Sequence, residues 1–180
     1  PIILLSCTDS QDNYLTADQN AEECASDGET TYICGLMNAE DLISVAGTDL
    51  IITTGMASSA LTDDEEVNGH IYLIDTKDDS WEDLVSKPNF SQELNSELYP
   101  ECPGALNVRN YSAHGLALRT KSAEVYDLFI TSHGAREAIE MFELDLSSGS
   151  ASLKWTGCVP LDESIMHNSV AILNDGGFVT

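Results

Sequence analysis

From about residue 35 onward the chain alternates short apolar runs with turn residues. The runs have the length of β-strands, are rich in β-branched and aromatic residues, and are bounded by Gly, Asp, Ser or Asn. They cover 42–47, 49–56, 70–75, 114–119, 126–132, 138–145, 152–159 and 168–173. No stretch keeps an amphipathic helical period over about three turns. The pattern predicts an all-β fold in which 78–104 is mainly a long connection.

A weak internal repeat refines this prediction. DLIITTG (49–55) recurs as DLFITSHG (127–134), and GGFVT (176–180) resembles both. The first two copies are each followed by a strand that ends in aspartate. Repeated hairpins of this kind are typical of a β-propeller, whose blades contain about 40–50 residues. Residues 35–180 therefore predict roughly three blades, and because propellers close with about 4–8, we expect the N-terminal part of a larger ring.

The charge of the chain excludes one class of partner. Acidic residues outnumber basic ones 31 to 7, which gives a formal net charge of -24. Such a surface repels phosphate backbones, so we expect no nucleic-acid partner. Hydrophobic residues make up 42% of the chain, which is enough for a core and too high for a disordered protein.

The first seven residues, PIILLSC, resemble the end of a bacterial lipoprotein signal. The mature protein would then begin at a lipid-modified Cys7, and the polar residues up to 34 would form a tether. This interpretation predicts an exported protein, anchored by lipid to the periplasmic face of a membrane or to the cell surface. The alternative is that the apolar run forms a first, buried strand.

The remaining cysteines form an even set that can pair in an oxidising compartment. Cys102 and Cys158 lie in ECPG and GCVP, which flank the histidine-containing hairpin, and we predict a disulfide between them. Cys24 and Cys34 are the other candidate pair. The cysteine spacing does not fit a zinc site, and the chain has neither a phosphate-binding glycine loop nor a GxSxG elbow.

Two histidines occupy matching ends of one predicted hairpin, SAHGLALRTKSAEVYDLFITSHG (112–134). Pairing Leu116 with Ile130 and Leu118 with Leu128 places His114 opposite Ser132, with His133 one step away on the neighbouring strand. Two imidazoles in contact can form a general base and the partner that orients it. The alternative for each histidine is an ordinary turn residue before a glycine.

Oxygen ligands for a cation occur on both sides of this hairpin in the sequence. Glu40 and Asp41 precede the first predicted strand of this region, and Asn168 begins the last. Carboxylate and amide oxygens suit calcium, which takes about 6–8 of them. The alternatives are a solvated turn for the acidic pair and a turn-capping role for Asn168.

Taken in order, NAEDL, SAHGLALR, LFITSHG followed by REAIEMFELD, WTGCVPL and NSVAILNDGGFVT resemble the calcium-dependent paraoxonase and arylesterase group. This group belongs to a wider set of six-bladed propellers that includes gluconolactonases and strictosidine synthases. The resemblance covers about residues 35–180. It implies a central tunnel that holds calcium, hydrolysis of lactones or aryl esters, and a histidine dyad that deprotonates water.

The resemblance also implies roles for individual residues. Glu40 and Asn168 match ligands of a catalytic calcium, His114 matches the base and His133 matches its partner. Matches to ligands of a second, structural calcium are Asp41, the carbonyl of Leu116 and position 169. Ser169 stands where the family pattern has an aspartate, which weakens that second site.

Two other functions remain open at this point. The chain could be an exported, non-catalytic propeller that is stabilised by calcium and acts as a binding or scaffold module. It could also be a sugar-lactone hydrolase that uses a divalent metal without the dyad. Loss of His114 would leave the activity of such a hydrolase unchanged.

Overall fold

The computed structural model describes residues 2–3, 28–57 and 67–180, and apart from one 3-10 turn their regular structure is entirely β. This confirms the predicted all-β class. The elements are β1 (Ile2–Ile3), β2 (Thr31–Tyr32), β3 (Ala39–Ser44), β4 (Leu50–Gly55), β5 (Val67–Asn68), β6 (His70–Asp75), β7 (Ser80–Asp83), η1 (Leu84–Ser86), β8 (Phe90–Gln92), β9 (Asn110–Ser122), β10 (Val125–Gly134), β11 (Ala138–Asp145), β12 (Ser152–Pro160), β13 (Ala171–Ile172) and β14 (Phe178–Val179).

The first large sheet is an antiparallel meander of four strands in the order β3-β4-β6-β7. Its central strands β4 and β6 are rich in Ile, Leu and Thr, and Ile52, Ile71 and Ile74 are fully buried. The fourth strand, β7, is not among the predicted strands and lies within 78–104, which is otherwise mainly a connection. SWED is short and acidic, so its strand character comes from pairing with β6 rather than from its own composition.

The second large sheet has the order β5-β9-β10-β11-β12-β8. Strands β9 to β12 form another antiparallel meander, while β5 and β8 add short parallel pairings at its two edges. The predicted hairpin register is confirmed over its central part, where Leu116 pairs with Ile130 and Leu118 with Leu128.

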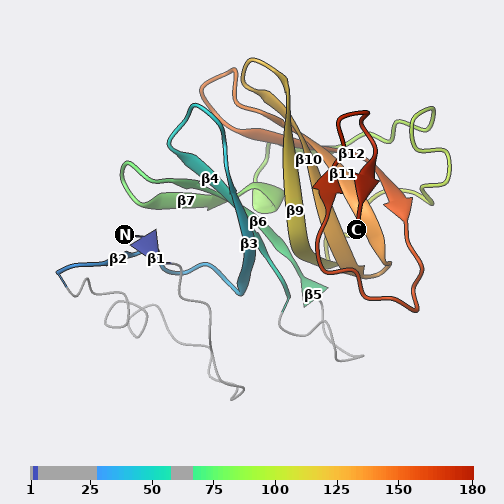
Figure 1. Cartoon of the computed structure of the whole chain (residues 1–180), viewed down its shortest axis with the longest axis horizontal. Helices are drawn as coiled ribbons and strands as arrows, with labels where there is room; N and C mark the ends of the chain where they lie inside the picture. The colour runs from blue at the N-terminus through green and yellow to red at the C-terminus, as the bar shows by residue number, and fades with distance from the viewer. Residues whose placement is uncertain (1, 4–27, 58–66) are drawn as a thin grey trace.

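The main core lies between these two sheets (Figure 1). It combines Ile52 and Ile71 from the first sheet with Tyr111, Phe142 and Trp155 from the second. Burial of each such large side chain contributes about 1.5–3 kcal/mol before entropy is counted. The two meanders are therefore joined by a continuous apolar interface.

A smaller apolar cluster covers the opposite face of the second sheet. Phe129, Ile139 and Met141 pack there against Ile172 and Phe178 of the β13–β14 hairpin, which lies in front of the sheet (Figure 1). The predicted strand at 168–173 is shorter than expected, because only Ala171–Ile172 pairs with β14. The segment before it has a different role, described with the site below.

Direct hydrogen bonds also link β9 to the end of the first sheet. The Thr54 hydroxyl donates to the carbonyl of His114, and the Leu116 amide donates to the Asp41 carboxylate at 3.0 Å. The Ala57 amide donates to the Ser112 hydroxyl at 3.2 Å. The first strands of the two meanders, β3 and β9, are thus held side by side.

Disulfides agree with the predicted pairing where the structure describes it. Cys102 and Cys158 are bonded, with sulfur atoms 2.05 Å apart, which confirms that prediction. Cys34 is also disulfide-bonded. Cys24, its predicted partner, and Cys7, the predicted lipidation site, lie outside the described residues.

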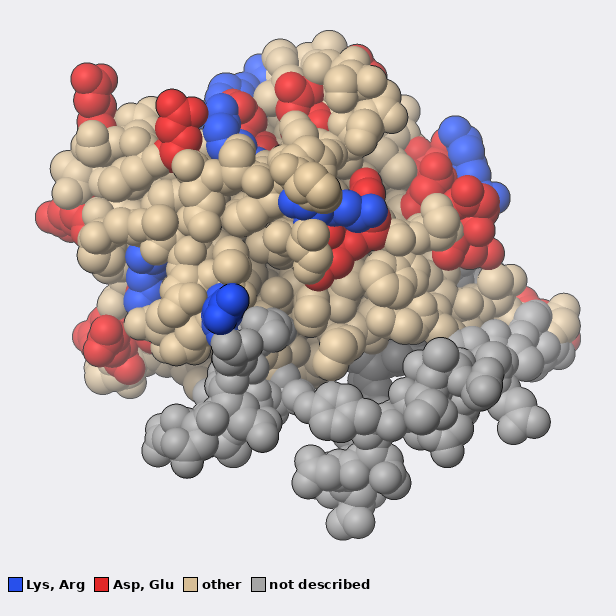
Figure 2. All heavy atoms as spheres, turned by 180° about the vertical axis from the view of Figure 1, so that it is seen from behind, with Lys and Arg blue, Asp and Glu red and all other residues tan. Residues whose placement is uncertain are grey.

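Near its start the chain forms a short parallel pairing between Ile2–Ile3 and Thr31–Tyr32. In the described part, no helix is long and apolar enough to cross a membrane. On the face shown in Figure 2 the acidic side chains occur in several separate groups, and some of these groups adjoin Lys or Arg side chains. On this face the charge is therefore spread over the surface rather than gathered in one region.

Candidate active site

A β-bulge brings the two histidines to the same face of the second sheet. Strands β9 and β10 change register between Ile130 and Ser132, so Ser132 faces Ala113 rather than the predicted His114. Because side chains alternate along a strand, an unbroken ladder would place His114 and His133 on opposite faces. The additional residue reverses the side on which His114 lies, and bulges near active sites commonly re-aim a side chain in this way.

The two imidazoles are in direct contact. His114 Nδ1 lies 3.0 Å from His133 Nε2, and the ring planes are inclined at 62°. The other nitrogen of His133, Nδ1, lies 2.7 and 2.9 Å from the two carboxylate oxygens of Glu137. These contacts form a continuous chain from Glu137 through His133 to His114.

Burial lowers the pKa of His114, and the neighbouring His133 lowers it further. The carboxylates of Glu40, Asp41 and Glu137 oppose this shift without overcoming it. His114 is therefore neutral at pH 7 and able to accept a proton.

Glu40 lies next to the outer nitrogen of the dyad. Its Oε2 is 3.8 Å from His114 Nε2, which is too far for a direct hydrogen bond, and the Glu40 side chain is 29% exposed. The structure therefore brings together Glu40 and His114, two residues that are 74 positions apart in the sequence numbering. The Glu40 carboxylate lies on the solvent side of His114.

Asp41, the next residue, is held by backbone amides. One of its oxygens accepts from the Leu42 amide at 2.9 Å and the other accepts from the Leu116 amide at 3.0 Å. The contact is with the Leu116 amide, whereas the predicted calcium ligand was the Leu116 carbonyl. The observed role of this carboxylate is a hydrogen-bonded link between β3 and β9.

Asn168 and Ser169 pack directly onto the bulge. A side chain at Gly115 would meet the Asn168 carbonyl oxygen at 2.5 Å and the Ser169 Cα at 2.4 Å. Only a glycine allows this approach, which places Asn168 next to His114 in the fold. Both residues are exposed, and the Ser169 carbonyl accepts from the Thr180 hydroxyl at 2.7 Å.

The donors at this end of β9 match the chemistry of calcium in part. The Glu40 carboxylate and the Asn168 side-chain amide supply the oxygen ligands that calcium prefers. Within the described ranges no group of three or more His, Cys, Asp or Glu residues is arranged to hold a metal. The second predicted site fits less well, because both Asp41 oxygens already accept amides and Ser169 offers no carboxylate.

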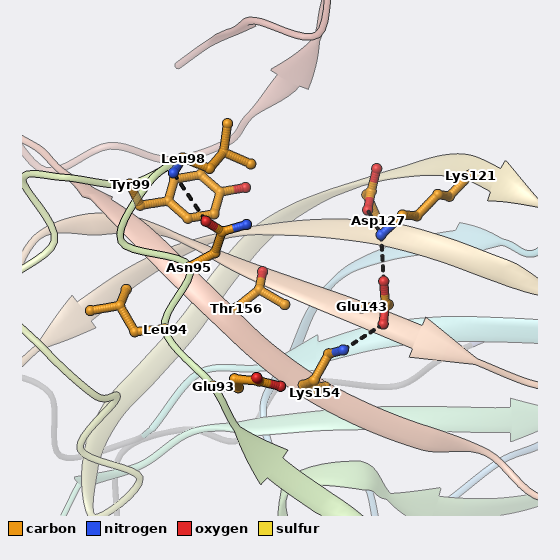
Figure 3. Close-up of a pocket in the computed structure, with 10 residues that line it drawn as sticks. All are labelled: Glu93, Leu94, Asn95, Leu98, Tyr99, Lys121, Asp127, Glu143, Lys154 and Thr156. Atoms are coloured by element: carbon orange, nitrogen blue, oxygen red, sulfur yellow. Dashed lines mark hydrogen bonds and ion pairs between the residues drawn. The ribbon is translucent and has the colours of Figure 1, made fainter.

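Two pockets lie on the second sheet. One, of about 310 Å³, borders the dyad and is lined by Asn110, Ser132, His133 and Arg136 among others. The other, of about 350 Å³, contains none of the predicted site residues. It runs across a charge ladder in which Glu143 lies between Lys121 and Lys154 (Figure 3).

Glu137 is the member of this site that the sequence analysis missed. It lies between β10 and β11, in the turn after His133, and within the motif REAIEMFELD, for which no site residue was predicted. A carboxylate four residues after a histidine, across a glycine-containing turn, is the signal that could have identified it.

No protein-family model matches the chain, and no curated protein matches it. The function is therefore argued from the geometry of the described residues. The contact of the two histidines is the most specific feature of that geometry.

Proposed function

We propose that the two meanders are neighbouring blades of a β-propeller and that β13–β14 begins a third. Each meander has four antiparallel strands, the composition of a propeller blade. Their first strands, β3 and β9, are in contact, as expected for strands that line a central axis. The two hydrogen bonds from Leu116 to Asp41 and from Thr54 to His114 support this arrangement.

At the ends of these strands we place a hydrolase site for lactones or aryl esters. The observation that carries this proposal is the 3.0 Å contact between His114 and His133, with the second nitrogen of His114 directed toward Glu40. A histidine that is neutral and oriented by a second one is suited to take a proton from water. The water then attacks the ester carbonyl, and no covalent intermediate is required.

Glu40 and Asn168 are the residues proposed to hold a calcium ion beside the dyad. Such an ion, when bound, supplies a Lewis acid for the ester carbonyl and a counter-charge for the oxyanion. Glu40 contributes negative charge and Asn168 a neutral oxygen, both in reach of water because both residues are exposed. The Gly115 contact fixes the backbone of Asn168 against β9.

An oxidising compartment fits the cysteine chemistry. Cys102, Cys158 and Cys34 are all disulfide-bonded, and such bonds persist mainly in exported proteins. We therefore include export in the proposal, in agreement with the lipoprotein-like PIILLSC segment.

The experiment that tests the hydrolase proposal uses the protein expressed from its complete gene. Phenyl acetate and a γ-lactone are offered with calcium, and then with excess chelator. We expect turnover that the chelator abolishes and that calcium restores. Calcium binding without turnover across a broad panel of esters and lactones would instead favour the non-catalytic binding module.

A further inference from the structure

We propose that Glu137 is a positioning residue that fixes the tautomers of both histidines and so leaves His114 Nε2 as the proton-accepting atom. This inference rests on the proposed function, since it assigns the base of that reaction to one nitrogen. It goes beyond the dyad, because it makes the site a chain of three side chains.

The first contact in this chain joins the Glu137 carboxylate to His133. Both Glu137 oxygens lie within 2.9 Å of His133 Nδ1, and a carboxylate can only accept hydrogen bonds. Nδ1 of His133 must therefore carry the proton. In a neutral imidazole the other nitrogen then has the lone pair, so His133 Nε2 is an acceptor.

In the same way, the contact with His133 fixes the tautomer of His114. Its Nδ1 lies 3.0 Å from the acceptor nitrogen of His133, so it must donate a proton in this contact. The remaining nitrogen of a neutral His114, Nε2, is left with its lone pair. This nitrogen is the one on the side of Glu40, where water and substrate have access.

The opposite arrangement would be unproductive. With the proton on Nε2 of His133, that nitrogen would donate to His114 Nδ1, and His114 Nε2 would carry a proton. Such a histidine can donate but cannot take a proton from water. Glu137 excludes this arrangement because it would place two acceptors, the carboxylate and a bare Nδ1, 2.7 Å apart.

The fold holds Glu137 in place from several directions. The Glu137 carbonyl accepts from the Leu161 amide at 2.9 Å, and the Ala135 amide donates to the Asn110 carbonyl at 2.9 Å. Arg136, between them, forms an ion pair with the buried Glu140 at 2.7 Å. His133 is itself only 5% exposed, so neither member of this contact can move freely.

Two variants of the complete protein test the proposal. Glu137→Gln keeps the size of the side chain, but its amide accepts or donates equally well and no longer requires a proton on Nδ1. Glu137→Ala removes the partner altogether. Glu97→Gln changes an exposed carboxylate on a connecting segment and serves as the matched control.

The primary measurement is the protonation of each ring nitrogen, read from ¹⁵N NMR of protein labelled at histidine. Resonances are assigned with His114→Gln and His133→Gln. We expect both histidines to be protonated at Nδ1 in the wild type and in the control. In the two Glu137 variants we expect each histidine to populate both tautomers. We also expect kcat to fall by about 10²-fold, within the range usually found when a general base is impaired.

The outcomes separate the inference from the proposed function. Unchanged tautomers in both Glu137 variants would overturn the inference, whatever the rate does. Altered tautomers with an unchanged rate would also overturn it, since Glu137 would then not serve the reaction. A wild type without hydrolytic activity contradicts the proposed function. The tautomer measurement would still show whether Glu137 fixes the tautomers of the two histidines.

Discussion

Glu140 is a buried charge next to the proposed site. It has no exposed surface, and its two oxygens accept hydrogen bonds from Arg136 at 2.7 and 3.0 Å. Trp155 Nε1 donates a third at 2.7 Å, and the Arg136 guanidinium lies over the Trp155 ring. This group anchors the turn that carries Glu137, so it connects core packing with the geometry of the dyad.

Arg136→Met tests the importance of this anchor. The substitution leaves the Glu140 carboxylate buried without its cation, so we expect the free energy of unfolding to fall by about 3–5 kcal/mol. Lys87→Met breaks the exposed pair with Glu82 and should change the free energy by at most about 1 kcal/mol. Urea unfolding measures both, and similar losses in the two variants would show that the Arg136 pair is not structurally important.

Individual site residues differ in how far the sequence predicts them. His114 and His133 stand beside glycines at matching strand ends, and Glu40 and Asn168 lie in motifs, so each could be selected from sequence. Glu137 was missed, because its contact with His133 depends on a turn that folds its carboxylate back onto that histidine. The contact of Asp41 with the Leu116 amide likewise depends on the packing of β3 against β9.

At the scale of elements, periodicity predicted the strands but not the irregularity that builds the site. Alternation gave the pairing of Leu116 with Ile130, and the structure confirms it. It gave the wrong partner for Ser132, because a two-residue period contains no information about a bulge. Strand β7 was missed for a related reason, since an acidic tetrapeptide pairs only when β6 is already in place.

Gly115→Ala tests the junction between the bulge and the segment at Asn168. The new methyl group would meet backbone atoms at 2.4 and 2.5 Å, so we expect that segment to move away from β9. Overpacking of this kind costs about 1–3 kcal/mol in the free energy of unfolding. The affinity for calcium and the rate of ester hydrolysis should fall together.

Gly149→Ala is the control for this change. A side chain there meets nothing within 4 Å, although its φ of +77° makes the substitution strained. Calorimetry and a hydrolysis assay should therefore find lower stability with unchanged calcium affinity and turnover. Normal calcium affinity and turnover in Gly115→Ala would show that the Asn168 segment does not serve the site.

For the whole molecule, the disulfide between Cys102 and Cys158 connects a long segment to β12. Its closed loop spans 56 positions, and loop-closure entropy predicts a contribution of about 4 kcal/mol. The double variant Cys102→Ser/Cys158→Ser should lose an amount of this order in urea unfolding. A loss below about 1 kcal/mol would contradict the entropic account of this link.

Acid should also weaken the molecule through the first sheet. Burial raises the pKa of Asp83, but hydrogen bonds from His70 and Ser86 outweigh burial and lower it below the usual 3.8. Its stabilisation is present above that value and is lost as the pH falls through the lowered pKa. The free energy of unfolding should therefore change less between about pH 6 and about pH 3 in Asp83→Asn than in the wild type. An equal change in the two proteins would contradict this role of Asp83.

The two proposed blades place the bulged histidine strand beside the proposed oxygen ligands. In the proposed reaction the histidine dyad acts on water, while Glu40 and Asn168 hold the metal. His114 can be replaced while Glu40 and Asn168 are kept, so the dyad and the metal ligands can be tested separately.

The most direct measurement compares kcat/KM and calcium affinity in the wild type, His114→Gln and Glu40→Ala. We predict that His114→Gln keeps its calcium affinity and loses about 10²–10⁴-fold in rate, whereas Glu40→Ala loses both. Unchanged turnover in His114→Gln, with calcium still required, would contradict this prediction by removing the dyad from the mechanism.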